Sequence, residues 1–185
     1  MPMLQVNLLS GYSDALKGRL SKALTAVIGG ITKAKPEAIS VWINEFNSED
    51  YSRGGEIRKP GSGTKDPSLL VQSYLTAMEQ RQLDTAQSYL SDNFVMTFPG
   101  SAEFSSLNQL VEWSQSRYRF VQKTLDSVTV AYEMEAIQVF VIGTLAGELP
   151  DGSAFKNVRF IDRFEVRDDV LVRQDVWNDL AEIRR

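Results

Sequence analysis

Only carboxylates, tyrosines, lysines and the amino terminus are available in this sequence for acid–base chemistry. The 185 residues include no Cys and no His. Their absence excludes thiolate metal sites, iron–sulfur clusters, cysteine nucleophiles and Ser-His-Asp arrangements, and it removes the commonest general base. We expect neither a metal site nor a cofactor, and any catalytic group must come from the remaining residue types.

Charge is distributed unevenly along the chain. Residues 1–65 contain nine Lys or Arg and six Asp or Glu, a balance of +3. Residues 66–185 contain eleven Lys or Arg and eighteen Asp or Glu, a balance of −7, so the whole chain has a net charge of −4. An acidic chain without a basic stripe argues against nucleic acid as the main partner. No apolar run approaches the ~20 residues of a membrane span, and no signal-peptide core follows Met1. We expect a soluble, cytoplasmic protein whose partner is a small molecule.

A segment rich in Gly, Pro and charge lies at the boundary between these two halves. Residues 54–67 contain a single large apolar side chain, Ile57, which is typical of an exposed connector. A chain of 185 residues is long for one domain and short for two large ones, so two small domains fit. We predict a first domain over residues 1–55, a linker over 56–66 and a second domain over 67–185.

Before the linker, the hydrophobic pattern predicts a strand, a helix and a strand. Apolar and polar residues alternate over 4–8 and again over 39–43. Between these runs, apolar residues recur at helical spacing over 16–31, and Ser13 is placed to cap the helix. Two strands joined by one helix form a parallel, right-handed βαβ unit. Such a small unit leaves part of its sheet uncovered, so we expect this half to oligomerise.

After the linker, the pattern predicts helices followed by long strands. The expected helices cover residues 70–78, 84–90 and 107–114, and a short strand covers 94–98. Four longer strand-like runs, separated by turn signals such as Pro150-Asp151-Gly152 and Asp168-Asp169, occupy 122–134, 136–148, 154–166 and 170–178. Helices followed by antiparallel strands indicate an α+β domain in which a curved sheet wraps around helices.

Four motifs of the first half occur together in chain order. They are Met1-Pro2 before a strand, the turn Leu8-Leu9-Ser10-Gly11-Tyr12-Ser13-Asp14, then Pro36-Glu37-Ala38, and Tyr51-Ser52-Arg53-Gly54-Gly55. Together they resemble the 4-oxalocrotonate tautomerase family over about residues 2–55. The resemblance implies that Met1 is removed and that the exposed proline amine moves a proton within an enol or dienol substrate.

The resemblance also implies a set of site residues around Pro2 as the catalytic acid and base. An α-amino group has a reference pKa of ~8, and an apolar pocket lowers it towards working pH. Tyr12 and Ser40 fall where the family has carboxylate-binding arginines, Tyr51 falls on the aromatic wall of the family pocket, and Arg53 is a nearby cation. Because Tyr and Ser lack the bidentate donor fork of Arg, we expect a neutral or monoacidic enol or ketone as substrate.

A second set of motifs runs through residues 66–185. It comprises Val71-Gln72-Ser73-Tyr74-Leu75-Thr76-Ala77-Met78, Leu83-Asp84, Leu90-Ser91-Asp92-Asn93-Phe94, Phe98-Pro99-Gly100, Phe160-Ile161-Asp162-Arg163-Phe164 and Asp175-Val176-Trp177-Asn178-Asp179. These motifs resemble a SnoaL-like domain of the nuclear transport factor two superfamily, a cone-shaped α+β barrel with an apolar pocket. The resemblance implies a second-domain pocket that includes Tyr74, Phe98, Trp113, Tyr118, Asp162 and Trp177.

Asp162 has the most specific expected role in that pocket. Ketosteroid isomerases share this fold, and by that resemblance Tyr74 and Asp162 take the oxyanion-donor positions, whereas the base position falls at Phe98. Burial would favour a protonated, hydrogen-donating carboxyl. The alternative is that Asp162 pairs with an arginine such as Arg159 or Arg163 in a structural network. Strand parity places Asp162 in an apolar row with Val158, Phe160, Phe164 and Val166.

Three functions remain open at this point. The first is a tautomerase or isomerase that uses Pro2, while the second domain binds a hydrophobic carbonyl substrate. The second is a non-catalytic binding protein for a small molecule. The third is a SnoaL-like cyclase, isomerase or dehydratase with its chemistry at Asp162 and Tyr74. For all three we expect a homo-oligomer, with a hexamer slightly preferred to a dimer.

Overall fold

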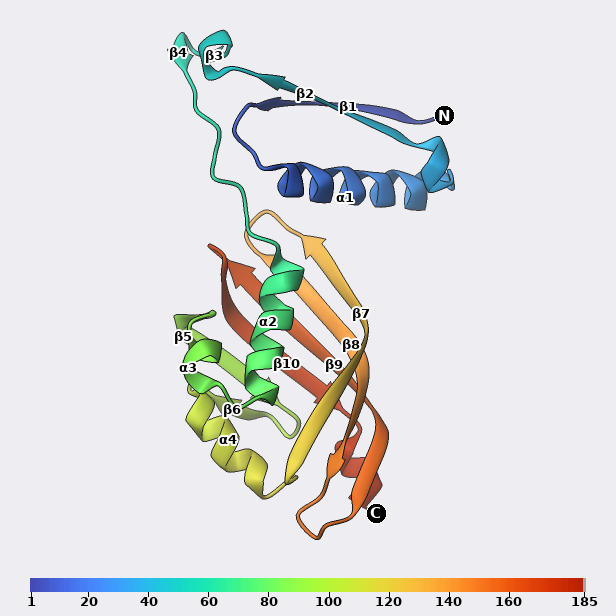
Figure 1. The fold of residues 1–185 in the computed structure, drawn as a ribbon, viewed down its shortest axis with the longest axis vertical. Helices are drawn as coiled ribbons and strands as arrows, with labels where there is room; N and C mark the ends of the chain where they lie inside the picture. The colour runs from blue at the N-terminus through green and yellow to red at the C-terminus, as the bar shows by residue number, and fades with distance from the viewer. Residues whose placement is uncertain (185) are drawn as a thin grey trace. The chain divides into compact units, whose positions relative to one another are not determined.

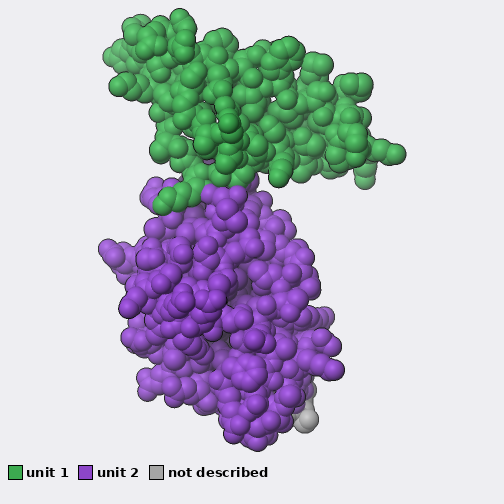
Figure 2. Space-filling model, viewed as in Figure 1, with its two compact units in different colours: residues 1–65 green, residues 66–185 purple. Residues whose placement is uncertain are grey.

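Two compact units make up the chain, one of residues 1–65 and one of residues 66–185 (Figure 2). The computed structural model describes residues 1–184. The first unit is a βαβ element followed by a short hairpin, and the second is an α+β domain with an open six-stranded sheet (Figure 1). The predicted fold class is confirmed.

In the first unit, one helix connects two parallel strands. Strands β1 (Met3–Leu9) and β2 (Ser40–Phe46) pair in register along their whole length, and α1 (Asp14–Thr32) joins them. Ser13 caps α1 as predicted, since its hydroxyl accepts a 3.2 Å hydrogen bond from the amide of Leu16. The unit also contains two 3-10 turns and a hairpin: η1 (Pro36–Ala38), η2 (Ser48–Asp50), β3 (Ser52–Arg53) and β4 (Glu56–Ile57).

The sheet of the first unit has one uncovered face. On the face that meets α1, Glu45 accepts a 2.7 Å hydrogen bond from Lys17 of the helix. On the opposite face, Met3, Trp42 and Phe46 are 69%, 64% and 46% exposed. None of residues 1–65, all of which the structure describes, is buried. Within one chain, this unit therefore has no closed hydrophobic core.

The segment that follows β4 packs back onto the start of α1. Arg19 donates a hydrogen bond to the carbonyl oxygen of Thr64. Gly63 has φ +69°, and a Cβ there would collide with Leu16 and touch the ring of Tyr12 at ordinary contact distance. This end of the linker is therefore seated on the first unit, and Tyr12 is one of the side chains that it contacts.

The second unit packs three helices against a sheet that curves around them (Figure 1). The sheet has the strand order β6-β5-β10-β9-β8-β7, in which β5 and β10 are parallel and the other pairs are antiparallel. In chain order the elements are α2 (Pro67–Glu79), α3 (Leu83–Gln87), β5 (Leu90–Phe98), β6 (Ala102–Phe104), α4 (Leu107–Gln115), β7 (Phe120–Tyr132), β8 (Ile137–Glu148), β9 (Ala154–Arg167), β10 (Val170–Asn178) and η3 (Leu180–Arg184).

Local sequence signals fix where several of these elements begin. Asp66 caps α2 by accepting a 3.0 Å hydrogen bond from the amide of Ser68, and Pro67 occupies the first turn, where no amide donor is needed. Ser106 caps α4 in the same way through the amide of Gln109. Asp168 and Asp169 have φ values of 48° and 62°, as required by the tight turn that joins β9 to β10.

One predicted helix is wrong in its extent. The pattern predicted a helix over residues 84–90, whereas α3 ends at Gln87 and β5 already begins at Leu90. The amide of Leu171 donates a 2.9 Å hydrogen bond to the carbonyl oxygen of Tyr89, and Leu90 pairs with Leu171 in the sheet. Pairing with a strand about 80 residues later in the chain overrides the local helical pattern.

The inner row of β9 agrees with the parity prediction. Its side chains face the helices and are at most 3% exposed: Val158, Phe160, Asp162, Phe164 and Val166. Residues between them are exposed or half-buried. Asp162 is therefore a carboxylic acid in the middle of the hydrophobic core.

We predict that Gly143→Ala destabilises the second unit by roughly 1–3 kcal/mol, because overpacking displaces backbone as well as side chains. A Cβ at Gly143 on the inner row of β8 would collide with the carbonyl oxygen of Thr124 on β7 and approach the Phe160 ring to 3.0 Å. Urea denaturation measures the change. The matched control is Gly18→Ala in α1, where no atom lies within 4 Å of the added methyl. Equal stability of the Gly143 variant and the unmodified protein would contradict this account of the β7–β8 packing.

Candidate functional site

Pro2 and Ser40 lie together at the start of the two parallel strands. The amide of Ser40 donates a 3.1 Å hydrogen bond to the carbonyl oxygen of Pro2. Met1, which precedes Pro2, is 93% exposed. These contacts put the predicted base beside one of the two positions where a substrate-binding side chain was expected.

The other predicted residues of the first unit lie at the opposite end of its sheet. Tyr12 follows the carboxyl end of β1, whereas Tyr51 and Arg53 lie beyond the carboxyl end of β2 (Figure 1). Seven residues of extended strand separate the two ends by about 20 Å. A single chain therefore does not bring Pro2 together with Tyr12, Tyr51 and Arg53.

Two adjoining chambers open between the helices and the inner face of the sheet in the second unit. The narrower chamber holds about 50 Å³ and the wider about 300 Å³. They share four lining residues, namely Phe98, Tyr118, Val121 and Lys123. Among the predicted pocket residues, Trp113 and Asp162 line the narrower chamber and Tyr74 lines the wider one.

Four polar side chains beside these chambers are linked to one another by an ion pair and hydrogen bonds. Lys123 of β7 forms an ion pair with Oδ2 of Asp162, and Gln174 of β10 donates a 3.4 Å hydrogen bond to the same oxygen. The side-chain oxygen of Gln174 accepts a 3.2 Å hydrogen bond from the hydroxyl of Tyr74. Tyr74 and Asp162 are thus linked through Gln174, and the Tyr74 hydroxyl is already used as a donor within the protein.

The partner of Asp162 differs from both expectations. Arg159 and Arg163, the alternatives considered from sequence, instead contact Asp179 and Asp175 at 2.6 and 2.7 Å. The ammonium group of Lys123 and the amide of Gln174 are both donors, so Asp162 is held as a carboxylate. The predicted hydrogen-donating carboxyl is therefore wrong for this arrangement.

Burial changes the acidity of the two tyrosines that line the chambers. Removal of Tyr74 from water raises the pKa of its hydroxyl well above the usual value, and the negative charge of Asp162 raises it further. Burial also raises the pKa of Tyr118, although a hydrogen bond with Ser114 and the charges of Arg81 and Arg117 oppose this shift. Both tyrosines are neutral hydroxyls at physiological pH.

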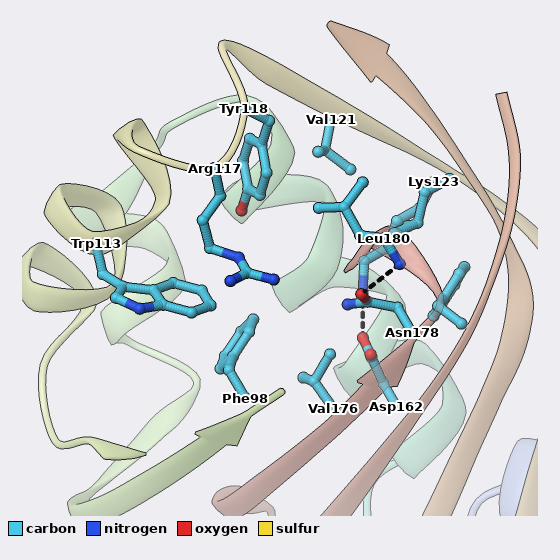
Figure 3. A pocket seen from close by; sticks show the side chains of 12 residues that line it. Phe98, Trp113, Arg117, Tyr118, Val121, Lys123, Asp162, Val176, Asn178 and Leu180 are labelled. Atoms are coloured by element: carbon cyan, nitrogen blue, oxygen red, sulfur yellow. Dashed lines mark hydrogen bonds and ion pairs between the residues drawn. The ribbon is translucent and has the colours of Figure 1, made fainter. Parts of the chain in front are cut away.

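An aromatic wall closes one side of the narrower chamber. The ring of Trp113 lies 5.5 Å from that of Phe98 and 5.2 Å from that of Phe104 between ring centroids. The guanidinium of Arg117 lies over Trp113, 4.5 Å from its ring centroid, and points into the chamber (Figure 3). This stacking holds a cation against an otherwise apolar surface.

Trp177 does not line either chamber. Its neighbours on β10, Val176 and Asn178, line the narrower chamber, and alternation along the strand turns Trp177 to the opposite face of the sheet. The side chain is 55% exposed. The prediction that Trp177 contributes to the pocket is therefore wrong for a single chain.

Lys123, Gln174 and Arg117 were not predicted as site residues. The inward direction of Lys123 could have been predicted, because it lies in the same row of β7 as Val121 and Leu125. The role of Gln174 depends on contacts between distant elements, whereas Arg117 stacks on Trp113, four residues earlier in the chain. Among residues 1–184, no cluster of His, Cys, Asp or Glu side chains could hold a metal ion, and no helix is long and apolar enough to cross a membrane.

The sequence comparisons divide the chain in two. A family model described as "Tautomerase enzyme" matches residues 2–59, and one described as "SnoaL-like domain" matches residues 71–174. A protein of Streptococcus mutans named "Probable tautomerase" is 36% identical over 61 residues, which are 33% of this chain and 100% of that protein.

Solved structures resemble the second unit in fold. An NTF2-like protein of unknown function from Burkholderia pseudomallei superposes with a TM-score of 0.54 at 14% identity, covering 64% of this chain and 95% of that one. An NTF2-like protein from Burkholderia thailandensis gives 0.54 at 15% identity, with coverage of 65% and 95%. At these identities the likeness concerns the fold alone.

We predict that Lys123→Met lowers the unfolding free energy by about 3 kcal/mol, because it leaves the Asp162 carboxylate buried without a cation. The double variant Lys123→Met/Asp162→Leu should recover most of that loss, since an apolar pair of similar volume needs no compensating charge. Urea denaturation measures both, with Lys156→Met on the exposed side of β9 as the matched control. If the single and double variants were equally destabilised, the Lys123–Asp162 pair would not be what keeps the carboxylate stable.

Proposed function

Because the chain belongs to the tautomerase family over residues 2–59 and to the SnoaL-like family over residues 71–174, we propose that it is a small-molecule isomerase. In this proposal the amine of Pro2 interconverts the enol and keto forms of its substrate. The second unit supplies a largely apolar pocket for the same class of molecule. The observation that carries this proposal is that residues of the first unit match a probable tautomerase over the whole length of that protein.

The position of Pro2 supports its role as the base. The tautomerase match begins at residue 2, and Met1 is almost fully exposed, which leaves it open to removal. With Met1 in place, the proline nitrogen is an amide and cannot accept a proton. With Met1 removed, it is a secondary amine that can accept and return a proton.

The reaction needs only one group that accepts and returns a proton. The neutral amine of Pro2 takes the proton of the enol hydroxyl as the C=O bond forms, and the resulting ammonium protonates the adjacent carbon. The product is the ketone, and the amine is regenerated without an oxidant, metal or second substrate. A single group of tuned pKa can therefore complete the cycle.

Assembly of several chains is part of this proposal. Pro2 is remote from Tyr12, Tyr51 and Arg53 in one chain, so a complete pocket needs these side chains from a neighbouring copy. The uncovered sheet face, with Met3, Trp42 and Phe46, supplies apolar surface for that contact, and burial of each large side chain contributes about 1.5–3 kcal/mol. We propose a homo-oligomer, with a hexamer slightly preferred to a dimer.

A second candidate places the chemistry in the second unit. The linked side chains Tyr74, Gln174, Asp162 and Lys123 favour it, because a buried carboxylate beside a chamber is typical of acid–base sites. A cyclase, dehydratase or isomerase would use this network without Pro2. A protein that only binds its ligand would need neither site to react.

We predict that Pro2→Ala lowers the rate of ketonisation of phenylenolpyruvate by about 10²–10⁴-fold, because the variant has lost its amino-terminal secondary amine. The loss of the enol absorbance measures the rate, and intact mass establishes that Met1 is absent from the unmodified protein. Pro36→Ala, an exposed proline at the start of η1, is the matched control and should keep the full rate. An unchanged rate in Pro2→Ala would overturn the proline mechanism and favour the second unit.

We predict that light scattering after size exclusion gives a mass several times the 20.8 kDa of one chain. Trp42→Glu should reduce that mass, because a carboxylate on the uncovered sheet face cannot be buried at low cost. Leu69→Glu, at an equally exposed apolar residue of α2, is the control and should leave the mass unchanged. A single-chain mass for the unmodified protein at micromolar concentration would rule out the shared pocket.

A further inference from the structure

We propose that the wider chamber of the second unit binds an uncharged aromatic ketone, and that the ammonium group of Lys123 donates a hydrogen bond to the carbonyl oxygen of this ligand. The inference rests on the ligand pocket of the proposed function, and it names the ligand class and the side chain that selects it. It concerns binding alone and requires no reaction in the second unit.

The ammonium group of Lys123 has donors that the protein does not use. Among residues 1–184, its only hydrogen-bond partner is Oδ2 of Asp162. The ring of Phe160 also lies near the cation, with its centroid 4.4 Å from Nζ. An ammonium group carries three N–H donors, whereas these two neighbours engage at most two of them. At least one N–H group of Lys123 therefore remains for a ligand.

Lys123 also lies where a ligand can reach it. The residue lines both chambers, and its side chain is 23% exposed, whereas the side chain of Asp162 has no exposed surface. Figure 3 shows Lys123 extending towards Asp162 among the side chains that line the narrower chamber. Of the two partners in this ion pair, only the lysine is accessible to a bound molecule.

The accessible group of this pair is a donor, so the ligand must present an acceptor. An ammonium group has no lone pair and accepts no hydrogen bond. The Tyr74 hydroxyl donates to Gln174 and does not compete for the same ligand oxygen. A carbonyl oxygen accepts a hydrogen bond without bringing a charge into the chamber, and a hydrogen bond to a charged group is stronger than one between neutral groups.

The charges around the wider chamber are already balanced. Its charged lining residues are Glu79, Arg81, Arg119 and Lys123. Arg119 forms an ion pair with Glu148, and Asp162 balances Lys123. The remaining two side chains carry one negative and one positive charge. A ligand carboxylate beside Lys123 would add a second negative charge next to a buried carboxylate, so the site favours an uncharged ligand.

The volume and lining of the wider chamber suit a flat apolar body. The chamber holds about 300 Å³, whereas an apolar cavity of about 150 Å³ is enough to bind benzene. Two fused rings with a small substituent therefore fit. Apolar side chains supply much of the lining, namely Leu75, Met78, Phe98, Leu110, Phe120 and Val121. Burial of the rings against these side chains supplies affinity, and the Lys123 hydrogen bond supplies selectivity.

Equilibrium dialysis of the full chain with three probes of matched shape tests the proposal. The probes are 2-acetonaphthone, 2-isopropenylnaphthalene, in which a CH₂ group replaces the carbonyl oxygen, and 2-naphthoate, which carries a negative charge. We expect 2-acetonaphthone to bind at least about tenfold more tightly than 2-isopropenylnaphthalene, because the alkene leaves the charged donor without its hydrogen bond. We also expect the ketone to bind more tightly than 2-naphthoate.

Two variants assign the contact to Lys123. In Lys123→Met/Asp162→Leu, which removes the donor and keeps the pocket apolar, the preference for the ketone over the alkene should disappear. In Asp162→Asn that preference should remain, and 2-naphthoate should bind at least as tightly as the ketone, because the ammonium charge is no longer balanced. Lys156→Met, on the exposed side of β9, is the matched control and should preserve both preferences. Circular dichroism establishes that each variant is folded.

Equal affinity for the ketone and the alkene, or no binding of the ketone, would overturn the proposal. A ketone preference that survives in Lys123→Met/Asp162→Leu would overturn it as well, since another group would then be the donor. The dialysis involves no turnover, so these outcomes leave the Pro2 reaction untouched. Pro2→Ala should leave the three affinities unchanged, and altered affinities in that variant would instead place the ligand in the first unit.

Discussion

A carboxylate without solvent contact lies at the centre of the second unit, and the arrangement of its pocket depends on how that charge is compensated. Asp162 occupies a position on β9 where every neighbour in the same row is apolar. Desolvation of an ion in such a place costs several kcal/mol unless a counter-charge lies close by. Lys123 reaches it from β7, two strands away in the sheet, and Gln174 reaches it from β10.

The contacts that compensate the charge of Asp162 also determine which hydrogen-bonding groups beside the chambers are already engaged. Lys123 and Gln174 approach the same oxygen, Oδ2, so the other oxygen, Oδ1, is buried without a hydrogen-bond partner among the described residues. Gln174 also accepts a hydrogen bond from the Tyr74 hydroxyl, so that donor is engaged within the protein. In this pocket Asp162 accepts hydrogen bonds from Lys123 and Gln174, and a shared fold by itself does not determine such contacts.

The two units differ in how far they bury their own apolar side chains. The second unit encloses its own core between one face of the sheet and the helices. The first is too small to do so, and none of its residues is buried within one chain. Its predicted catalytic group, Pro2, and three of its predicted binding residues, Tyr12, Tyr51 and Arg53, lie at opposite ends of the same two strands. In the proposed oligomer, contact with another copy would both bury apolar surface of the first unit and complete its site.

Much of this organisation could be predicted from the sequence. The alternation of apolar and polar residues before and after the amphipathic helix α1 predicted the βαβ unit. The same alternation along β9 placed Asp162 on the inward face, because successive side chains of a strand point to opposite faces. The cap at Ser13 and the turn at Asp168-Asp169 were likewise local.

What required the tertiary structure was every interaction between distant segments. Strand pairing with Leu171 decided where α3 stops and β5 begins, although the local pattern favoured a longer helix. The partner of Asp162 was decided by which side chain crosses the sheet to reach it, and Lys123 lies 39 residues away in the chain. Local patterns specify which way a residue faces, whereas a charge in the core is stabilised by whichever distant group the fold brings within contact.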